Sequence, residues 1–152
     1  MALIAQPDWL PEPLRQGYGF QHVSPMRRST FVSGRSMNRR AYTNTPSNLE
    51  LRWLMEDMRC SLFEKWFQEV LKDGTAWFAL RLRSPLGMDH HKCRFTDIYN
   101  GPTLSEGNLW SIVAPVEMYL RPLAPDGWVE APGIVLGAGL VDIAANREWP
   151  EA

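Results

Sequence analysis

The clearest pattern of apolar and polar positions lies between residues 49 and 56. Leu49, Leu51, Trp53 and Met55 alternate there with residues that are mostly charged. Because successive side chains of an extended strand point to opposite faces, this alternation places the apolar side chains together on one face. The segment is therefore predicted to be a β-strand with one buried face.

The next segment changes to the period of an α-helix. Ser61 and Glu64 match a capping box, in which the serine caps the first turn. Gly74 is placed to end the helix in a left-handed cap. The pattern predicts one amphipathic helix over residues 61–73. Its apolar stripe consists of Leu62, Phe63, Trp66, Phe67, Val70 and Leu71.

Three further strands are predicted after the helix, over residues 76–83, 92–99 and 109–120. The turn sequence Ser84-Pro85-Leu86-Gly87 separates the first two. Short connections between such strands require antiparallel pairing. Pro115 lacks an N–H donor, so the last strand is expected at a sheet edge or with a bulge.

Glycine and proline mark the breaks between these segments. Residues 28–43 predict two short strands broken near Ser33-Gly34, and Asn100-Gly101-Pro102 is expected to end a strand. Together the segments predict an α+β fold. An antiparallel β-sheet, sandwich- or barrel-like, would carry one principal amphipathic helix, with extended arms at both ends of the chain.

The two ends of the chain differ from the middle. Residues 1–25 contain four prolines, which fix φ and remove N–H donors, so an extended arm is predicted rather than a helix. The apolar residues of this arm need burial at the core edge or on a neighbour. Residues 122–152 are too apolar for a solvated tail and are predicted to dock on the sheet or on a partner. The core domain is predicted over residues 26–121.

The composition fits one folded domain. A chain of 152 residues is long enough to bury a sizeable core. No apolar run reaches the roughly 20 residues of a membrane span. Asp8 and Trp9 come early, without a basic segment before an apolar stretch, so no signal peptide is expected. Cys60 and Cys93 are accordingly expected as reduced thiols rather than as a disulfide.

Charge is unevenly distributed along the chain. The net charge of −1 argues against a dedicated nucleic-acid binder. Basic residues outnumber acidic ones up to Tyr42, and acidic residues outnumber basic ones after Leu123. Opposite charge at the two ends suggests contacts between neighbouring copies of the chain or with partners.

A group of arginines lies between positions 27 and 40. Its functional interpretation is a surface for an acidic protein partner or for nucleic-acid phosphates. The alternative is a solvated strand face that keeps a sheet edge soluble. An acidic protein partner is favoured because the whole chain is not basic. The candidate interface residues are Trp9, Tyr18, Phe20, Arg27, Arg28, Arg35, Arg39, Arg40, Ile134, Leu136 and Leu140.

The segment His90-His91-Lys92-Cys93 is the one metal-like cluster in the sequence. His91 and Cys93 would share one face of a strand, whereas His90 would not. A structural zinc site needs about four ligands in paired spacings, and that pairing is missing. We therefore expect no metal, and a polar loop that leads into a strand whose Cys93 faces the core.

The sequence carries no recognisable catalytic motif. It has no Gly-x-Ser-x-Gly elbow, no Walker loop and no dinucleotide-binding glycine motif. Asp89 and Asp97 are close in sequence, but a hairpin tip with polar neighbours is not the setting of a catalytic carboxylate pair. No enzyme activity and no cofactor are expected, and a metal-dependent hydrolase is kept only as a minor alternative.

Several motifs follow one another in order between residues 11 and 121. The most specific is Leu62-Phe63-Glu64-Lys65-Trp66-Phe67 followed by Gly74-Thr75-Ala76-Trp77-Phe78. The others are Pro11, Gly17, the block Arg28…Ser33-Gly34-Arg35…Arg39-Arg40, Leu51, Trp53, Cys93-Arg94-Phe95, Tyr99 and Trp110-Ser111-Ile112-Val113-Ala114-Pro115-Val116-Glu117. In this layout the chain resembles the short minor tail proteins at the tail tip of long-tailed bacteriophages.

The resemblance implies a small sheet-and-helix subunit that joins the tail tube to the tail tip. It implies a homo-oligomeric ring in the virion tail, assembled in the host cytoplasm, with other proteins of the tube, tip or hub as partners. Membranes and specific nucleic acids are not among the implied partners. Residues after Leu123 extend beyond the resemblance. A cytoplasmic protein-binding or assembly-chaperone module is the alternative from a different class.

Overall fold

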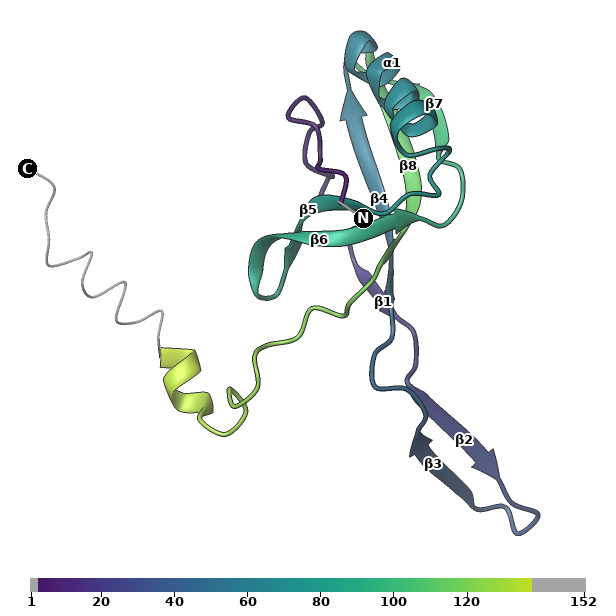
Figure 1. The fold of residues 1–152 in the computed structure, drawn as a ribbon, viewed down its shortest axis with the longest axis vertical. Helices are drawn as coiled ribbons and strands as arrows, with labels where there is room; N and C mark the ends of the chain where they lie inside the picture. Colours follow the sequence, from purple (N-terminus) through teal and green to yellow (C-terminus); the bar gives the residue numbers. More distant parts are fainter. Residues whose placement is uncertain (1–2, 138–152) are drawn as a thin grey trace, which may run out of the picture. The chain divides into compact units, whose positions relative to one another are not determined.

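The computed structural model describes residues 3–137 of the chain. The chain divides into two units at the bond between Pro122 and Leu123. The first unit holds all the strands that Figure 1 labels. In the second unit, residues 132–137 are helical. No helix between residues 3 and 137 is long and apolar enough to cross a membrane.

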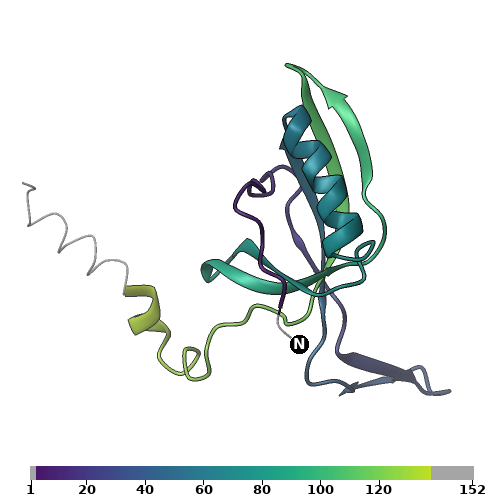
Figure 2. The ribbon, with the colours of Figure 1, turned by 45° about the horizontal axis from the view of Figure 1, so that its top comes forward.

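The main sheet contains six strands, and every pair among them is antiparallel. These strands are β1 (Phe20–His22), β4 (Ser47–Met55), β5 (Phe78–Ser84), β6 (Gly87–Phe95), β7 (Asn100–Ser105) and β8 (Leu109–Met118). Their order is β1–β4–β8–β6–β5, and β7 also pairs with β8. Figure 2 shows the principal helix, α1 (Asp57–Lys65), lying against the β4 and β8 part of the sheet. The predicted α+β class, an antiparallel sheet with one principal helix, is confirmed.

β4 supplies the centre of the core. Leu49, Leu51, Trp53 and Met55 are all buried, whereas the residues between them are exposed or half-buried. Trp53 lies opposite Ile112 of β8, which is fully buried on the same face. The predicted strand and its buried face are therefore confirmed.

β8 is a central strand, which corrects the edge position expected from Pro115. β4 pairs along one side of β8, and β6 and β7 pair along the other. β6 ends opposite Val116 and β7 begins opposite Val113, so the ladder has a gap between them. The Pro115 carbonyl accepts a hydrogen bond from the Thr96 N–H on this side (3.1 Å). Because a strand residue directs its N and O atoms to one side, the missing N–H of Pro115 also faces this side, just past the end of β6, and the ladder between β8 and β4 is not interrupted.

The helix begins earlier than its sequence motif predicts. Glu56 occupies the N-cap position of α1 without a side-chain cap bond. Ser61 therefore lies inside the helix, and the predicted capping box is wrong. The helix starts one turn earlier because the buried Cys60 extends the apolar face that packs on the core. Asp57 in the first turn also suits the positive end of the helix dipole.

A π-helical turn, η1 (Trp66–Val70), follows α1 and changes the phase of the buried face. The Leu71 N–H donates to the Trp66 carbonyl, one residue further back than in an α-helix (3.1 Å). Leu62 and Val70, which the α period places in the apolar stripe, are 43% and 44% exposed. The buried residues of this segment are Cys60, Phe63, Trp66, Phe67 and Leu71.

The helical segment ends earlier than the sequence predicts, because its last helical residue is Val70 and its C-cap is Leu71, so the cap predicted at Gly74 is wrong. Gly74 has a φ of +81°, in the left-handed region. Lys72 and Asp73 also have positive φ, so the chain turns sharply here. A Cβ atom at Gly74 would lie 2.9 Å from the Phe67 ring. Both the backbone conformation and the close packing therefore require glycine at this position.

The second half of the sheet departs from the prediction at two places. β6 starts at Gly87, so His90 and His91 lie within a strand and not in a loop. Residues 100–102, expected to end a strand, begin β7. β7 and the first half of β6 are largely exposed, so the alternation of apolar and polar residues that marks β4 is absent there.

The N-terminal segment packs on the sheet of its own chain. Leu10 is buried in the core. The Ile4 carbonyl accepts a hydrogen bond from the Ala79 N–H, and the Leu14 N–H donates to the Arg52 carbonyl, both at 2.7 Å. The segment therefore packs at the core edge, one of the two burial sites expected for its apolar residues. It also covers the outer edge of β5.

Candidate functional site

A separate two-stranded sheet is the most exposed feature of the first unit. β2 (Met26–Thr30) pairs antiparallel with β3 (Ser36–Arg40), and every residue of both strands is exposed. Figure 1 shows this ribbon running on from the ends of β1 and β4. The two predicted strands broken near Gly34 are confirmed, and we call residues 26–42 the β-arm. A lone two-stranded ribbon is marginally stable in water, so the β-arm is suited to work against a partner.

The register of the β-arm sorts its arginines onto two faces. Arg27 lies directly opposite Arg39, whereas Arg28 lies opposite Asn38. Because side chains alternate along a strand, Arg27 and Arg39 share one face and Arg28 points to the other. Two like charges directly opposite each other oppose strand pairing by about 0.2–1 kcal/mol. The face with Arg27 and Arg39 therefore favours an anionic group between the two side chains.

Arg40 differs from the other arginines of the β-arm. Its Nε donates to the Tyr42 carbonyl (3.2 Å) and its Nη2 donates to the Thr43 carbonyl (3.0 Å). These bonds fasten the end of β3 to the turn that follows it. The ion pairs found among residues 3–137 join other side chains, so the remaining β-arm arginines have no carboxylate partner in that range.

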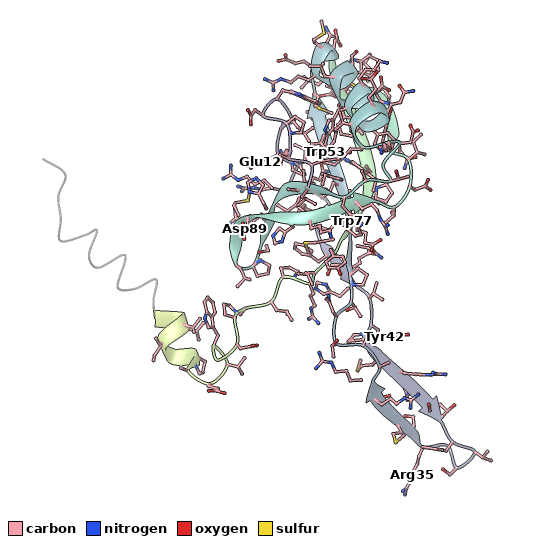
Figure 3. All side chains as sticks on the ribbon, viewed as in Figure 1. Glu12, Arg35, Tyr42, Trp53, Trp77 and Asp89 are labelled. Atoms are coloured by element: carbon pink, nitrogen blue, oxygen red, sulfur yellow. The ribbon has the colours of Figure 1, made fainter. Side chains whose placement is uncertain are left out.

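The β-arm also exposes large apolar side chains beside its arginines. Figure 3 shows Arg35 at the far end of the β-arm and Tyr42 near its base. Arginine, methionine and aromatic residues together are enriched in the cores of protein–protein interfaces. The composition therefore favours a protein partner. The exposed apolar residues are Met26, Phe31, Val32, Met37 and Tyr42.

An open hollow of about 580 Å³ lies at the base of the β-arm. It brings arginine side chains together with one methionine and one aromatic ring. Such a hollow can hold a carboxylate and an apolar side chain at the same time. Its lining residues are Met26, Arg27, Arg39, Arg40, Ala41 and Tyr42.

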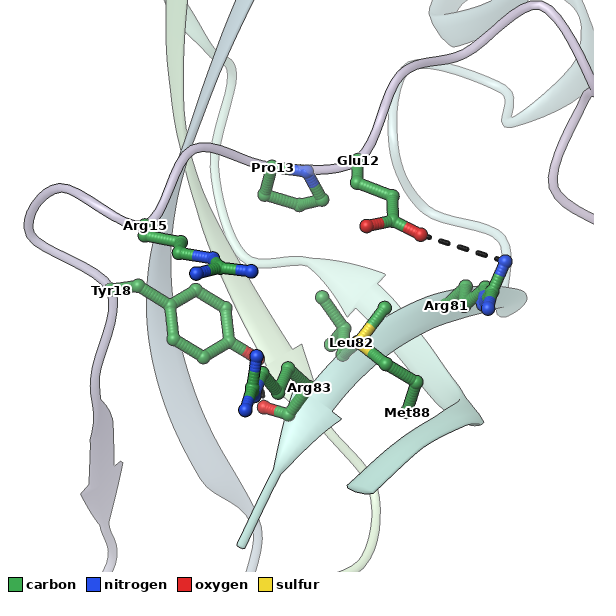
Figure 4. Close-up of a pocket in the computed structure, with 8 residues that line it drawn as sticks. All are labelled: Glu12, Pro13, Arg15, Tyr18, Arg81, Leu82, Arg83 and Met88. Carbon is green, nitrogen blue, oxygen red and sulfur yellow. Dashed lines mark hydrogen bonds and ion pairs between the residues drawn. The ribbon is translucent and has the colours of Figure 1, made fainter. Parts of the chain in front are cut away.

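A smaller pocket, of about 140 Å³, lies between the N-terminal segment and β5 (Figure 4). Glu12 and Arg81 form an ion pair beside it, with 3.5 Å between Oε1 and Nη1. Tyr18 Oη donates to the Arg83 carbonyl at 2.6 Å. These contacts join the N-terminal segment to the sheet, so the pocket is a by-product of that junction.

The aromatic residues predicted as interface residues in the N-terminal segment lie against their own core. Trp9 packs edge-on to Trp66, with 6.4 Å between ring centroids, and Tyr18 packs edge-on to Phe20 at 5.6 Å. Trp9, Tyr18 and Phe20 are partly buried against the core cluster. Burial raises the pKa of Tyr18 to about 12. Packing within the chain therefore accounts for much of their surface.

The predicted interface residues of the C-terminal region fall into two groups. Ile134 and Leu136 belong to the second unit and are 77% and 81% exposed. Leu140 lies outside the residues that the structure describes. The exposed pair offers apolar surface that a partner can cover.

His91 and Cys93 share one face of β6, as the sequence predicts. Within residues 3–137, no group of three or more histidine, cysteine or acidic side chains is placed to hold a metal ion. His91 Nε2 is buried without a hydrogen-bond partner, and burial lowers the pKa of His91, so its ring is neutral at pH 7. Burial raises the pKa of Cys93 to about 12, which keeps this free cysteine a thiol and a poor nucleophile.

Comparison with known proteins adds no relative to this picture. No protein-family model, curated protein or solved structure matches the chain. The resemblance to phage tail proteins therefore rests on the order of the sequence motifs alone, and the role of the β-arm rests on its own geometry and chemistry.

Proposed function

We propose that this chain is a structural subunit of a bacteriophage tail, which acts by assembly and not by catalysis. The observation that carries an assembly role is the β-arm, whose two strands are exposed at every residue. Such a ribbon gains stability by lying against another protein surface. Its arginines, which have no carboxylate partner among residues 3–137, and its exposed apolar side chains fit an acidic protein surface.

The virion setting of the proposal comes from the resemblance in motif order. It specifies a homo-oligomeric ring at the tail tip, or between tube and tip, with tube, tip or hub proteins as neighbours. A closed ring needs a head-to-tail contact, in which one surface of each copy meets a different surface of the next copy. The β-arm is one such surface. A cytoplasmic assembly chaperone, the alternative, would use the same β-arm transiently and leave the finished particle.

Quantitative mass spectrometry of purified particles separates these functions. A tail subunit is expected at a fixed ratio to the tail-tube protein in every preparation. A chain that is needed for tail assembly but absent from finished particles would identify a chaperone. A chain that is absent from particles and dispensable for assembly would overturn both.

Shortening the β-arm tests its part in assembly. A chain in which an Asn-Gly turn replaces residues 26–40 should fold, because these residues lie outside the core cluster. We expect this chain to be missing from particles. The control variant, with Lys65→Ala and Glu69→Ala, removes an exposed ion pair of the helical segment and should enter particles normally. Normal incorporation of the shortened chain would remove the β-arm from the proposal.

A further inference from the structure

We infer that the partner of the β-arm is a second copy of this chain, and that the Arg27–Arg39 face binds segment 126–136 of that copy. The inference rests on the proposed function, because it names the partner of the same β-arm. It follows from three observations: the chemistry of the hollow, the composition of segment 126–136, and the division of charge between the two units.

The hollow at the base of the β-arm defines what its occupant must carry. Arg27 and Arg39 line it together with Met26 and Tyr42. A carboxylate placed between the two guanidinium groups relieves their repulsion and accepts charge-assisted hydrogen bonds from both. Met37 lies on the same face two residues from Arg39 and is exposed, so it gains from contact with apolar side chains. The occupant must therefore present carboxylates next to apolar groups.

Segment 126–136 presents that combination on the second unit. Asp126 and Glu130 are exposed and lie on either side of Trp128 and Val129 in the sequence. Val129 is 90% exposed, and Trp128 is 43% exposed. The segment contains no basic residue that would repel the β-arm. Its carboxylates and apolar side chains are thus accessible to the same partner.

The distribution of charge along the chain indicates a second copy as that partner. Residues 23–44 contain five arginines and no acidic residue, and residues 123–152 contain five acidic residues and one arginine. Residues 45–122 are almost balanced, with ten acidic and nine basic residues. One chain therefore carries both halves of a complementary pair. Complementary charge on two different surfaces sets a head-to-tail direction for the contact between copies.

Two charge-reversed full-length chains test this contact. The first carries Arg27→Glu and Arg39→Glu in the β-arm, and the second carries Asp126→Lys and Glu130→Lys. We expect the natural chain to self-associate in sedimentation velocity at low salt, and to dissociate as salt rises. For each reversed chain alone, the dissociation constant for self-association should rise about tenfold or more. Equimolar mixing of the two reversed chains should restore association, because every β-arm then meets a segment of opposite charge.

A control variant keeps the charge change but moves it away from the Arg27–Arg39 face. Arg28→Glu with Arg35→Glu reverses two charges on the other face and near the tip of the same β-arm. This chain should retain most of the self-association, and circular dichroism should show that all four chains are folded. Equal loss in the control would show a non-specific effect of net charge and overturn the assignment of the face.

Other outcomes separate the inference from the proposed function. If the natural chain stays monomeric at all concentrations yet is found in particles, the β-arm binds another tail protein, and only the inference fails. If the monomer protects segment 126–136 from hydrogen exchange and the first reversed chain does not, the contact lies within one chain and the inference is again overturned. If the chain self-associates as inferred but is absent from particles, the proposed virion role fails and the contact stands.

Discussion

Phe67 shows at the scale of one residue how the helical segment is held on the sheet. Its buried ring contacts Phe95 and Tyr99 edge-on, at 5.1 Å and 5.0 Å between centroids. We expect Phe67→Ala to lower the free energy of unfolding by about 3–5 kcal/mol, through lost burial and a cavity. Leu62→Ala is the control, because Leu62 is exposed, and should cost less than about 1 kcal/mol in the same denaturant titration. Similar losses in both variants would contradict the phase of the helix.

Ser61 gives the opposite expectation to the one that its motif suggests. As an N-cap, Ser61→Ala would cost about 1 kcal/mol. Ser61 instead lies within α1 and is exposed, and alanine is the better helix former there. We expect the free energy of unfolding to stay within about 0.5 kcal/mol of the natural chain. A loss near 1 kcal/mol in a urea titration would restore the capping box.

Cys93 predicts how stability depends on alkaline pH. Its pKa rises from an ordinary value of 9.0 to about 12 through burial. Below pH 9 the Cys93 thiol is protonated in both the folded and the unfolded chain. The contribution of its raised pKa to the free energy of unfolding is then fully present. Above pH 9 only the unfolded chain loses the proton, so the free energy of unfolding falls as pH rises towards 12. Cys93→Ala should flatten this fall between pH 8 and 11, although Tyr18 and Tyr99, whose pKa values are also raised to about 12, keep part of it.

At the scale of the element, burial decides which strands the sequence can reveal. β4 is predictable because its alternate residues face a continuous core. β7 pairs with β8 but is largely exposed, so no alternation of apolar and polar residues marks it. Its first residues, Asn100-Gly101-Pro102, also have the composition of a chain break. The start of α1 was hidden for a related reason, since Cys60 is a weaker apolar signal than the aromatic residues that follow.

For the candidate site, the sequence predicts the composition but not the geometry. The arginine group and its break near Gly34 are visible in the sequence, so the β-arm is predictable as a pair of short strands. The pairing of Arg27 with Arg39 depends on the register, which no sequence pattern fixes when both faces of a ribbon are exposed. The hydrogen bonds from Arg40 to the Tyr42 and Thr43 carbonyls likewise depend on the geometry of the turn.

The end of the helical segment offers a test of packing against backbone strain. Gly74 and Gly107 have similar positive φ, at +81° and +74°. A Cβ atom at Gly74 would lie 2.9 Å from Phe67, whereas nothing lies within 4 Å of one at Gly107. Gly107→Ala should cost about 1 kcal/mol for its φ alone. Gly74→Ala should cost about 1–3 kcal/mol more in a thermal or denaturant melt, and equal costs would mean that the Phe67 ring moves aside freely.

At the scale of the whole molecule, the division at Pro122 separates the folded core from one half of the proposed contact. The first unit contains the main sheet, the helical segment and the hydrophobic core cluster found within residues 3–137. The second unit contributes segment 126–136 and most of the excess acidic charge. The first unit therefore carries the core and, in the β-arm, one half of the contact that we propose, and the second unit carries the other half.

Deleting residues 123–152 should leave the first unit folded, because the core residues found between positions 3 and 137 all lie before residue 123. We expect the far-ultraviolet circular dichroism and the denaturant midpoint to stay close to those of the full chain. Tail assembly should fail, because the deletion removes the acidic segment that we assign to the β-arm of the next copy. The full-length chain with Asp126→Lys and Glu130→Lys is the matched comparison, since it keeps the length and only reverses the charge, and its tail assembly should also fail. Infectious particles at normal yield from the truncated chain would show that residues 123–152 have no part in assembly.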